Sequence, residues 1–559
     1  LQGTSGTPLA WAGSGGNTFN NYGKLTKNTD ADQILDINGD INNYGTFTLG
    51  DSTGALTIAD SGSHTGTFAL GADSTLNFNG GSASVYGWDR PSDAETGLFT
   101  GTGQVKLTSG TIQVDAVQTM GAGGPSLYLA AGTLQGTQNL TLNNAVTMEG
   151  VAITDAGLLT TGGTVNITGN PRLEAKTWDN TGTITISGSG QLKLDNSATL
   201  DNNADGTIDL QGTSGTPLAW AGSGGNTFNN NGTLIKTSKA DQTLGINGTV
   251  NNAGMFDLQA NTGSLSVDGS LATIGAIEVT SGATFRKTGG FTNAGTIGGS
   301  GTLDVGANNT LTNTGTLRPG PTNGDTTGTL SITGNLNNSG NVNIELEGTS
   351  SGQYDVLAVS GTATLGGTLN VTEFNGFLTS KNNAFTVLTA GTKSGNFATF
   401  NYPEDVTFNT DASAANNLIL TAGAISTHWN TDANGTWATA ANWSRGVPTT
   451  GTDFDNVVIS RAGADPIVTI SSGSSYKVAA FTCDDSLSIT GGTLTVNGTS
   501  TINNLNLSGG TLAGSGNVSL TGANTWSGGT ISLGAGGGGL SLLPGKTLTI
   551  EGTDYKYLS

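Results

Sequence analysis

An internal duplication constrains this chain more than any other feature of its sequence. Residues 1–21, LQGTSGTPLAWAGSGGNTFNN, recur without a single change as residues 210–230. A looser likeness extends the duplicated block to residues 1–50 and 210–259. Fixed internal periods are typical of solenoids and arrays, in which each repeat packs on its neighbours. We therefore expect both copies to fold alike, as two stretches of one continuous spiral.

A shorter period of 22 residues lies inside each copy. The turn that ends at Gly23 recurs at Gly45, and in the second copy the same turns end at Gly232 and Gly254. Asparagine and glycine tolerate the left-handed backbone that a sharp corner requires, so we assign these residues to corners. Related turns with similar spacing end at Gly182, Gly206, Gly295, Gly315 and Gly340.

Each corner is followed by a short run in which apolar residues alternate with Thr or Asp, as in residues 182–186. This alternation predicts strands with one buried face. Between the copies, the apolar positions keep their character while the residues between them change. The retained pairs are Leu35/Leu244, Ile37/Ile246, Ile41/Val250, Phe47/Phe256 and Leu49/Leu258.

Short strands, frequent corners and this period predict an all-β fold, a right-handed parallel β-helix of ~22-residue turns. A β-sandwich array is the rival, but it favours repeats of about 100 residues. The two copies should lie about nine or ten turns apart, and asparagines at equivalent corners should stack into an amide ladder along the axis.

The regularity of the sequence divides the chain into four regions. We expect β-helix turns over residues 1–347, a separate small β block over 348–424 and a tryptophan-rich segment over 425–456. Further turns fill residues 457–559 and should continue past the last residue. Leu1 is not an initiator methionine, so we expect the chain to be part of a longer protein.

The charge balance excludes several classes of partner. The chain of 559 residues has a net charge of −21, and only 11% of its residues are charged. A chain without basic patches does not suit nucleic acid or anionic membrane surfaces. Cys483 is the single cysteine, which rules out a disulfide framework. No apolar stretch reaches 18 residues, so this segment should not insert into a membrane as a helix.

Two irregular blocks resemble parts of known proteins. In residues 354–397, Tyr354-Asp355-x-Leu357 is followed by a Leu-Gly-Gly-Thr-Leu core at 365–369, by Phe-Thr-Val-Leu at 385–388 and by Ser-Gly-x-Phe at 394–397. This block resembles the end of autotransporter passenger domains and related secreted bacterial β-helix proteins. Residues 429–460 resemble the tryptophan-rich segment that precedes β-helical stretches in large bacterial surface adhesins. The resemblance implies an exported protein displayed on a bacterial surface.

Residues 86–98 are the best candidate for a carbohydrate site. An aromatic side chain beside several carboxylates is typical of a sugar subsite, and paired acids are what a polysaccharide-degrading enzyme on a β-helix would need. A solvated loop with a local ion pair has the same composition. The candidate residues are Tyr86, Trp88, Asp89, Arg90, Asp93 and Glu95.

The tryptophan-rich segment offers a second candidate. Trp437 and Trp443, with Trp429 nearby, could present a carbohydrate platform, or they could cap an end of the core. Trp11 and Trp220 occupy identical positions in the two copies, for which we expect a shared structural role.

Catalytic and metal chemistry find little support in the sequence. His64 and His428 are the only histidines, and neither lies in a nucleophile motif. We predict no catalytic residue, no metal site and no cofactor. Calcium is the least excluded ion, because the first copy offers oxygen ligands at alternating positions, whereas Lys239 stands at one of these positions in the second copy. Those ligands are Asp30, Asp32, Asp36, Asn38 and Asp40.

The sequence as a whole predicts a non-enzymatic, extracellular structural or adhesive protein. Its expected partners are surface glycans or further copies of itself, through head-to-tail or lateral association, because unpaired strand edges are templates for addition. The alternative is a polysaccharide-binding or polysaccharide-degrading β-helix enzyme with its site near residues 86–98.

Overall fold

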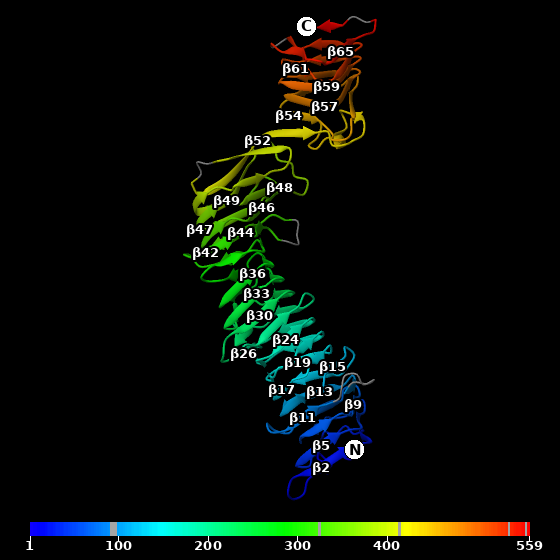
Figure 1. Cartoon of the computed structure of the whole chain (residues 1–559), viewed down its shortest axis with the longest axis vertical. Coiled ribbons are helices and arrows are strands. Elements are labelled where there is room, and N and C mark those ends of the chain that lie inside the picture. The colour runs from blue at the N-terminus through cyan, green and yellow to red at the C-terminus, as the bar shows by residue number, and fades with distance from the viewer. Residues whose placement is uncertain (90–97, 322–325, 412–414, 535–536, 554–555, 559) are drawn as a thin grey trace. The chain divides into compact units, whose positions relative to one another are not determined.

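The computed structural model describes residues 1–89, 98–321, 326–411, 415–534, 537–553 and 556–558. Within these ranges the chain is almost entirely strand and turn, and helical structure is limited to short 3-10 turns such as η1 (Ala440–Asn442). Successive turns stack in sequence order, as the colour sequence in Figure 1 shows.

Three strands make one turn of the spiral. The first turn comprises β1 (Leu9–Ala10), β2 (Asn17–Asn21) and β3 (Lys24–Lys27). The second comprises β4 (Gln33–Asp36), β5 (Gly39–Asn43) and β6 (Thr46–Leu49). Each strand pairs in parallel with its counterpart one turn later, β1 with β4, β2 with β5 and β3 with β6. We call these three stacks the first, second and third face. The predicted parallel β-solenoid of ~22-residue turns is confirmed, with about 24 turns.

The core follows the predicted alternation. In β25 (Thr183–Ile186), Ile184 and Ile186 are buried while the two threonines face outward. The apolar residues retained between the two copies are all buried as well. Because neighbouring turns cover each inward side chain, burial of this kind supplies about 1.5–3 kcal/mol per large aliphatic residue.

The corner glycines are required for a reason other than the predicted one. Gly45, Gly254 and their counterparts do not have positive φ, so the left-handed explanation is wrong for them. A Cβ on Gly45 would lie 2.1 Å from the carbonyl oxygen of Gly23, and one on Gly254 would lie 2.0 Å from that of Gly232. Stacked corners approach too closely for any side chain.

The predicted amide ladder is present and buried. The Nδ2 atom of Asn202 donates to Oδ1 of Asn230, and Asn230 donates to Asn252, each at 2.8 Å. Each such bond contributes about 1 kcal/mol, and the loss of one partner leaves a buried polar atom unpaired. The ladder asparagines in this stretch end third-face strands, and they are Asn180, Asn202, Asn230, Asn252, Asn293, Asn313 and Asn338.

The asparagine ladder is interrupted on the third turn of each copy, where another residue replaces asparagine. In the second copy this residue is Thr273, which accepts from Asn252 at 3.4 Å. The next Oδ1 atom, on Asn293, is buried without a hydrogen-bond partner. In the first copy the third residue is His64, which pairs with Asn43 in the strand register. Both ring nitrogens of His64 are buried and unpartnered, and burial lowers its pKa to about 3.

The two copies lie on different faces of the solenoid. Leu9 and Ala10 form β1 on the first face, but their counterparts Leu218 and Ala219 lie in β29 (Leu218–Trp220), which belongs to the second face. Strand β29 comes 28 strands after β1, which is nine turns and one further strand. The Asn21–Asn43 ladder therefore follows the second face, while the Asn230–Asn252 ladder follows the third.

The chain divides into two compact units that interleave in sequence. The first comprises Leu1–Ile344, Asp355–Leu369 and Leu388–Thr399, and the second comprises Glu345–Tyr354, Asn370–Val387 and Phe400–Ser559.

The second unit contains an antiparallel pairing, between β51 (Val406–Thr410) and β52 (Asn417–His428). Parallel pairing then resumes from β52 to β54 (Asn456–Ile459).

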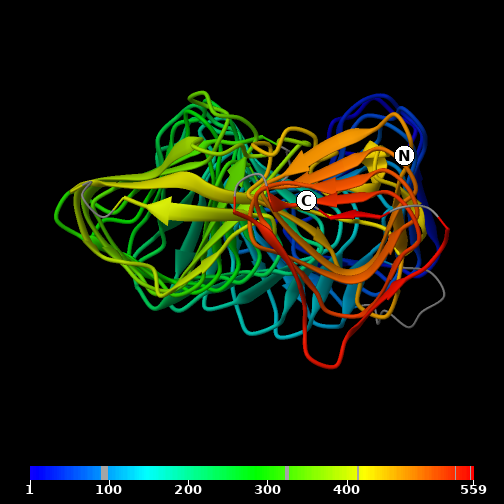
Figure 2. The ribbon, with the colours of Figure 1, turned by 90° about the horizontal axis from the view of Figure 1, so that it is seen from above.

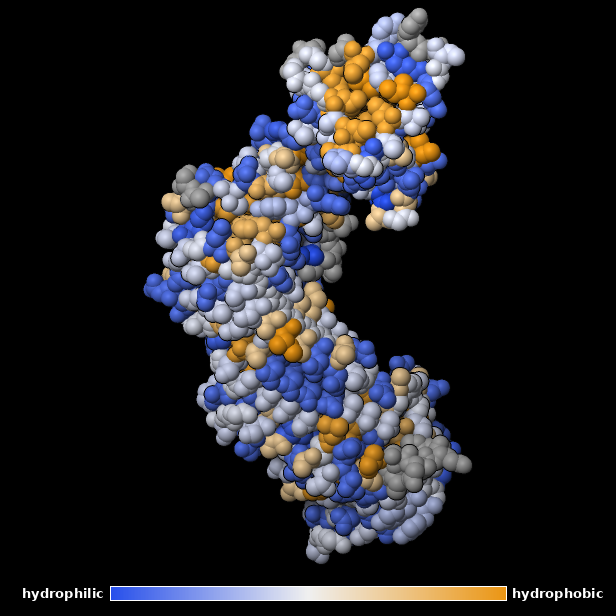
Figure 3. Space-filling view, turned by 45° about the horizontal axis from the view of Figure 1, so that its top comes forward, coloured by the Kyte–Doolittle hydropathy of each residue, from blue (hydrophilic) through white to orange (hydrophobic). Residues whose placement is uncertain are grey.

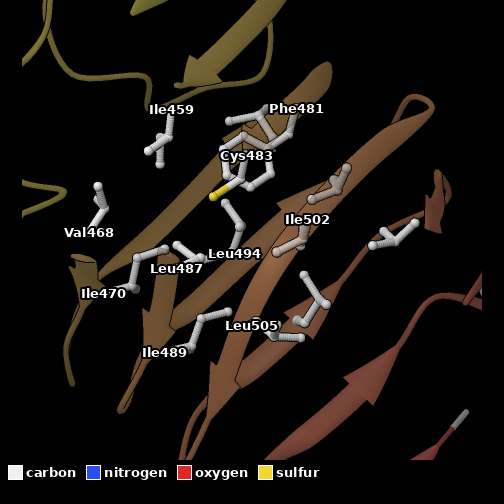
Figure 4. Close-up of a cluster of buried hydrophobic side chains, with 14 of the residues drawn as sticks. Ile459, Val468, Ile470, Phe481, Cys483, Leu487, Ile489, Leu494, Ile502 and Leu505 are labelled. Atoms are coloured by element: carbon white, nitrogen blue, oxygen red, sulfur yellow. The ribbon is translucent and has the colours of Figure 1, made fainter. Parts of the chain in front are cut away.

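The turns of residues 457–534 close around their own apolar core. The long strands β57 (Ala480–Ile489) and β59 (Ser500–Leu507) each contribute several of its side chains. Figure 4 shows Cys483 among Ile459, Phe481 and Ile502, and burial raises the pKa of its thiol. Viewed from above, the orange and red turns run around a closed coil (Figure 2).

Candidate functional site

The described part of the segment 86–98 belongs to the core. Tyr86 and Trp88 lie in β11 (Val85–Trp88), and both are fully buried. The Tyr86 hydroxyl donates to the carbonyl oxygen of Ile58 at 3.3 Å, and the Trp88 ring packs edge-on against Phe99 at 4.8 Å. Neither ring is available to stack on a sugar, so their assignment to a carbohydrate subsite is wrong. Arg90, Asp93 and Glu95 lie outside the described residues.

Asp89 has an acidic neighbour that the sequence did not reveal. It follows β11, and Asp115 follows β14 (Thr111–Val114) one turn later. Burial raises the pKa of Asp89, a hydrogen bond from Ser63 opposes this, and contact with the Asp115 carboxyl adds to the rise. Glycosidase carboxyls stand at least about 5 Å apart so that a sugar fits between them. Two carboxyls in direct contact leave no such space.

Trp437 and Trp443 do not form an exposed carbohydrate platform. Both are buried, and their rings meet at 4.9 Å, with Trp429 at 5.2 Å from Trp443. The Trp443 indole donates to the carbonyl of Trp437 at 2.9 Å, and the Trp437 indole donates to that of Pro448 at 3.1 Å. These rings form the first layer of the core of the following turns. Their position agrees with the alternative that these tryptophans cap an end of the core.

At the corners where the sequence suggested calcium ligands, a lysine ammonium binds the oxygen atoms of the loop. Lys236 is fully buried, and its ammonium donates to the carbonyls of Ser238 and Ala240 and to Gln242. Burial lowers its pKa to about 8, and the nearby Asp241 opposes the shift. Lys27 makes the equivalent contact with Thr29 in the first copy. Among the described residues no group of three acidic, histidine or cysteine side chains is placed to hold a metal ion.

The two histidines occupy unrelated sites. His64 is an unpartnered residue of the first ladder. His428 contacts Asp405 through Nδ1, while the Ser444 hydroxyl donates to the other oxygen of Asp405. A nucleophilic serine must donate to the histidine itself, so this arrangement does not activate Ser444. The buried Arg445, which pairs with Glu373, completes an ionic cluster within the second unit.

A solvent-accessible groove lies beside Trp220, which was expected to have a structural role. Trp220 is 51% exposed and its duplicate Trp11 is 46% exposed, so both indoles face solvent. Trp220 borders a groove of about 550 Å³. The groove crosses four turns on the second face, and its side chains include Lys193, Asp268 and Gln191. The verbatim repeat marks this position in the sequence, but its residues do not distinguish an exposed tryptophan from a buried one.

Comparison of the sequence with known proteins identifies no relative. The sequence matches no protein-family model and no curated protein. In the described ranges of the chain, no helix is both long and apolar enough to span a membrane.

Proposed function

We propose that this chain is a non-enzymatic structural and adhesive protein that acts outside the cell, on a bacterial surface. The observation that carries the proposal is the continuous ladder of parallel strands in the first unit, reinforced by buried asparagines that hydrogen-bond from turn to turn. Bending or shearing such a stack breaks hydrogen bonds between turns in concert, which suits a stiff extended support.

The surface chemistry supports the same proposal. The face of the first unit visible in Figure 3 is mostly blue and white, with separate small orange areas. Outward positions of the strands carry Thr, Asn and Asp, and the chain has a net charge of −21. A polar and acidic surface keeps a secreted protein soluble and offers many hydroxyl and amide groups to glycans. The resemblance of residues 354–397 to autotransporter passengers points to the same place of action.

Adhesion and catalysis can be separated in one experiment. Beads coated with the purified chain should be retained under flow on surfaces that carry polysaccharides, whereas beads coated with an inert acidic protein should wash away. The same polysaccharides, incubated with the chain in solution, should keep their length by size-exclusion chromatography. Shortened chains would instead support the polysaccharide-degrading alternative, and absence of retention on every surface would contradict adhesion.

Self-association is the other expected partnership. Unpaired strand edges favour addition of further strands, so sedimentation of the purified chain should show species that grow with protein concentration. A single sedimenting species over a hundredfold concentration range would contradict self-association and leave adhesion in place.

A further inference from the structure

The groove beside Trp220 has a floor made by two small residues. Lys193, Ala219 and Gly245 follow one another in register on β26 (Leu192–Asp195), β29 and β32 (Gln242–Gly245). Because Ala219 and Gly245 lack large side chains, the surface sinks between Lys193 on one turn and Asp268 on the turn after Gly245. Three intervals between adjacent strands put these two charged residues about 14 Å apart along the axis.

The walls of the groove combine one aromatic face with polar groups of both kinds. Trp220 contributes a half-exposed indole. Lys193 can only donate hydrogen bonds and Asp268 can only accept them, while Gln191 offers its amide oxygen as a further acceptor. The Gln191 side chain is held in place by bonds of 2.9 Å to the Ser214 hydroxyl and 2.8 Å to the Thr216 hydroxyl. This wall is therefore ordered before any ligand arrives.

We propose that the groove binds a neutral oligosaccharide, with one sugar ring stacked on Trp220 and hydroxyls of different sugar units bonded to Lys193 and to Asp268. Sugar rings present an apolar face and a rim of hydroxyls that both donate and accept, which matches an indole beside mixed polar groups. The volume falls within the range of small-ligand sites. This inference rests on the adhesive part of the proposed function and names a ligand class and a place for it.

Other ligand classes fit this groove less well. The two charged side chains have opposite signs, and the chain carries a net charge of −21, so an anionic polymer gains little here. The strands beneath the groove are already paired on both sides, as β29 is with β26 and β32. No free strand edge is present there for a peptide to extend the sheet.

The first copy provides an internal control for the site. Trp11 belongs to the identical 21-residue segment and is nearly as exposed as Trp220. At the position of Gly245, however, the first copy carries Asp36. A Cβ built on Gly245 would meet no atom closer than 3.8 Å, so a side chain can be placed there without a backbone clash. Gly245→Asp therefore transfers the floor of the first copy into the groove.

The test starts with a glycan array probed with the intact chain, followed by titration of the best neutral oligosaccharide. Trp11→Ala leaves Trp220 as the exposed indole among the described tryptophans, so its fluorescence reports on the groove. We expect Trp220→Ala and Gly245→Asp each to weaken binding at least about tenfold, since a lost aromatic anchor costs 1.4 kcal/mol or more. Trp11→Ala should change the affinity less than about twofold.

The outcomes separate this inference from the proposed function. Binding that survives Trp220→Ala and Gly245→Asp, or that falls equally with Trp11→Ala, would overturn the groove as the site while leaving adhesion in place. Binding to acidic glycans alone, or to none on the array, would overturn the ligand class. Unchanged melting temperatures of the variants would show that the solenoid is intact. The surface variants Lys193→Ala and Asp268→Ala, which do not touch the core, should each weaken binding severalfold as an independent reading.

Discussion

The two copies of the duplicated block fold alike locally but differ in their surroundings. Residues 1–21 and 210–230 are identical, yet the strands of the second copy lie one face further round the solenoid. Their strands, corners and ladder asparagines correspond, because these depend on the residues themselves and on the adjacent turns. Burial differs, since Phe19 is only partly buried whereas Phe228 is fully buried. The face depends only on how many strands come before. Identical sequence therefore determines the local structure of a copy, whereas the number of preceding strands determines its face of the solenoid.

Alanine at the first corner glycine should give the largest difference between the copies. A Cβ on Gly232 would lie 2.2 Å from the carbonyl oxygen of Gly206, whereas one on Gly23 meets no atom within 4 Å. We expect Gly232→Ala to lower the free energy of unfolding by about 3 kcal/mol and Gly23→Ala by less than about 0.5 kcal/mol. Urea unfolding followed by circular dichroism measures both, and equal losses would refute the stacking explanation for these glycines.

Acid should distinguish the third turns of the two copies. The pKa of His64 falls from 6.5 to about 3 on folding, so the unfolded chain takes up a proton first as the pH is lowered. The stability linked to His64 is therefore complete above pH 6.5 and declines toward pH 3, by about 1.4 kcal/mol per pH unit. His64→Asn should remove this part of the acid sensitivity. Unfolding titrations at several pH values test it, with Thr273→Asn as the matched change that should leave the pH dependence unaltered.

Removal of one ladder asparagine should cost more in the second copy. Asn230 has a ladder partner on both sides, Asn202 and Asn252, whereas Asn21 has the partner Asn43 on the following turn. We expect Asn230→Ala to lower the free energy of unfolding by about 2 kcal/mol and Asn21→Ala by about 1 kcal/mol. Hydrogen exchange of the neighbouring turns would localise the effect. A larger loss at Asn21 would contradict the ladder as the source of stability.

Completion of the second ladder should give a small gain. Thr273→Asn would place an Nδ2 donor against the buried, unpartnered Oδ1 of Asn293 and raise the free energy of unfolding by about 1 kcal/mol. Thr273→Val has a similar volume but removes the oxygen that accepts from Asn252, so it should be destabilising. A thermal melt of the three proteins ranks them, and a Thr273→Asn variant that melts below the parent would refute the prediction.

Periodicity was sufficient to predict the strands, their buried faces and the amide ladder, because each depends on a residue and its neighbours one turn away. The corner glycines were found for the wrong reason, since the distance between stacked backbones, which brings a carbonyl of the preceding turn against a Cβ, is not visible in the residue types. Trp88 was misplaced, and the two alternatives for Trp437 could not be separated, because a tryptophan among polar residues has the same composition whether its ring points inward or outward. Trp220 was missed because identity between copies says nothing about exposure.

Because each turn has three strands, the number of strands in a duplicated or inserted segment determines on which face of the solenoid the later strands lie. A duplicated segment whose number of strands is divisible by three places its copies on the same face. Any other number of strands places the copies on different faces. The spacing of 28 strands between β1 and β29 is not divisible by three, so Trp11, which follows β1, and Trp220, in β29, belong to different faces of the solenoid. One flat target can meet only one of these indoles, whereas a three-dimensional meshwork of glycan can engage both at once.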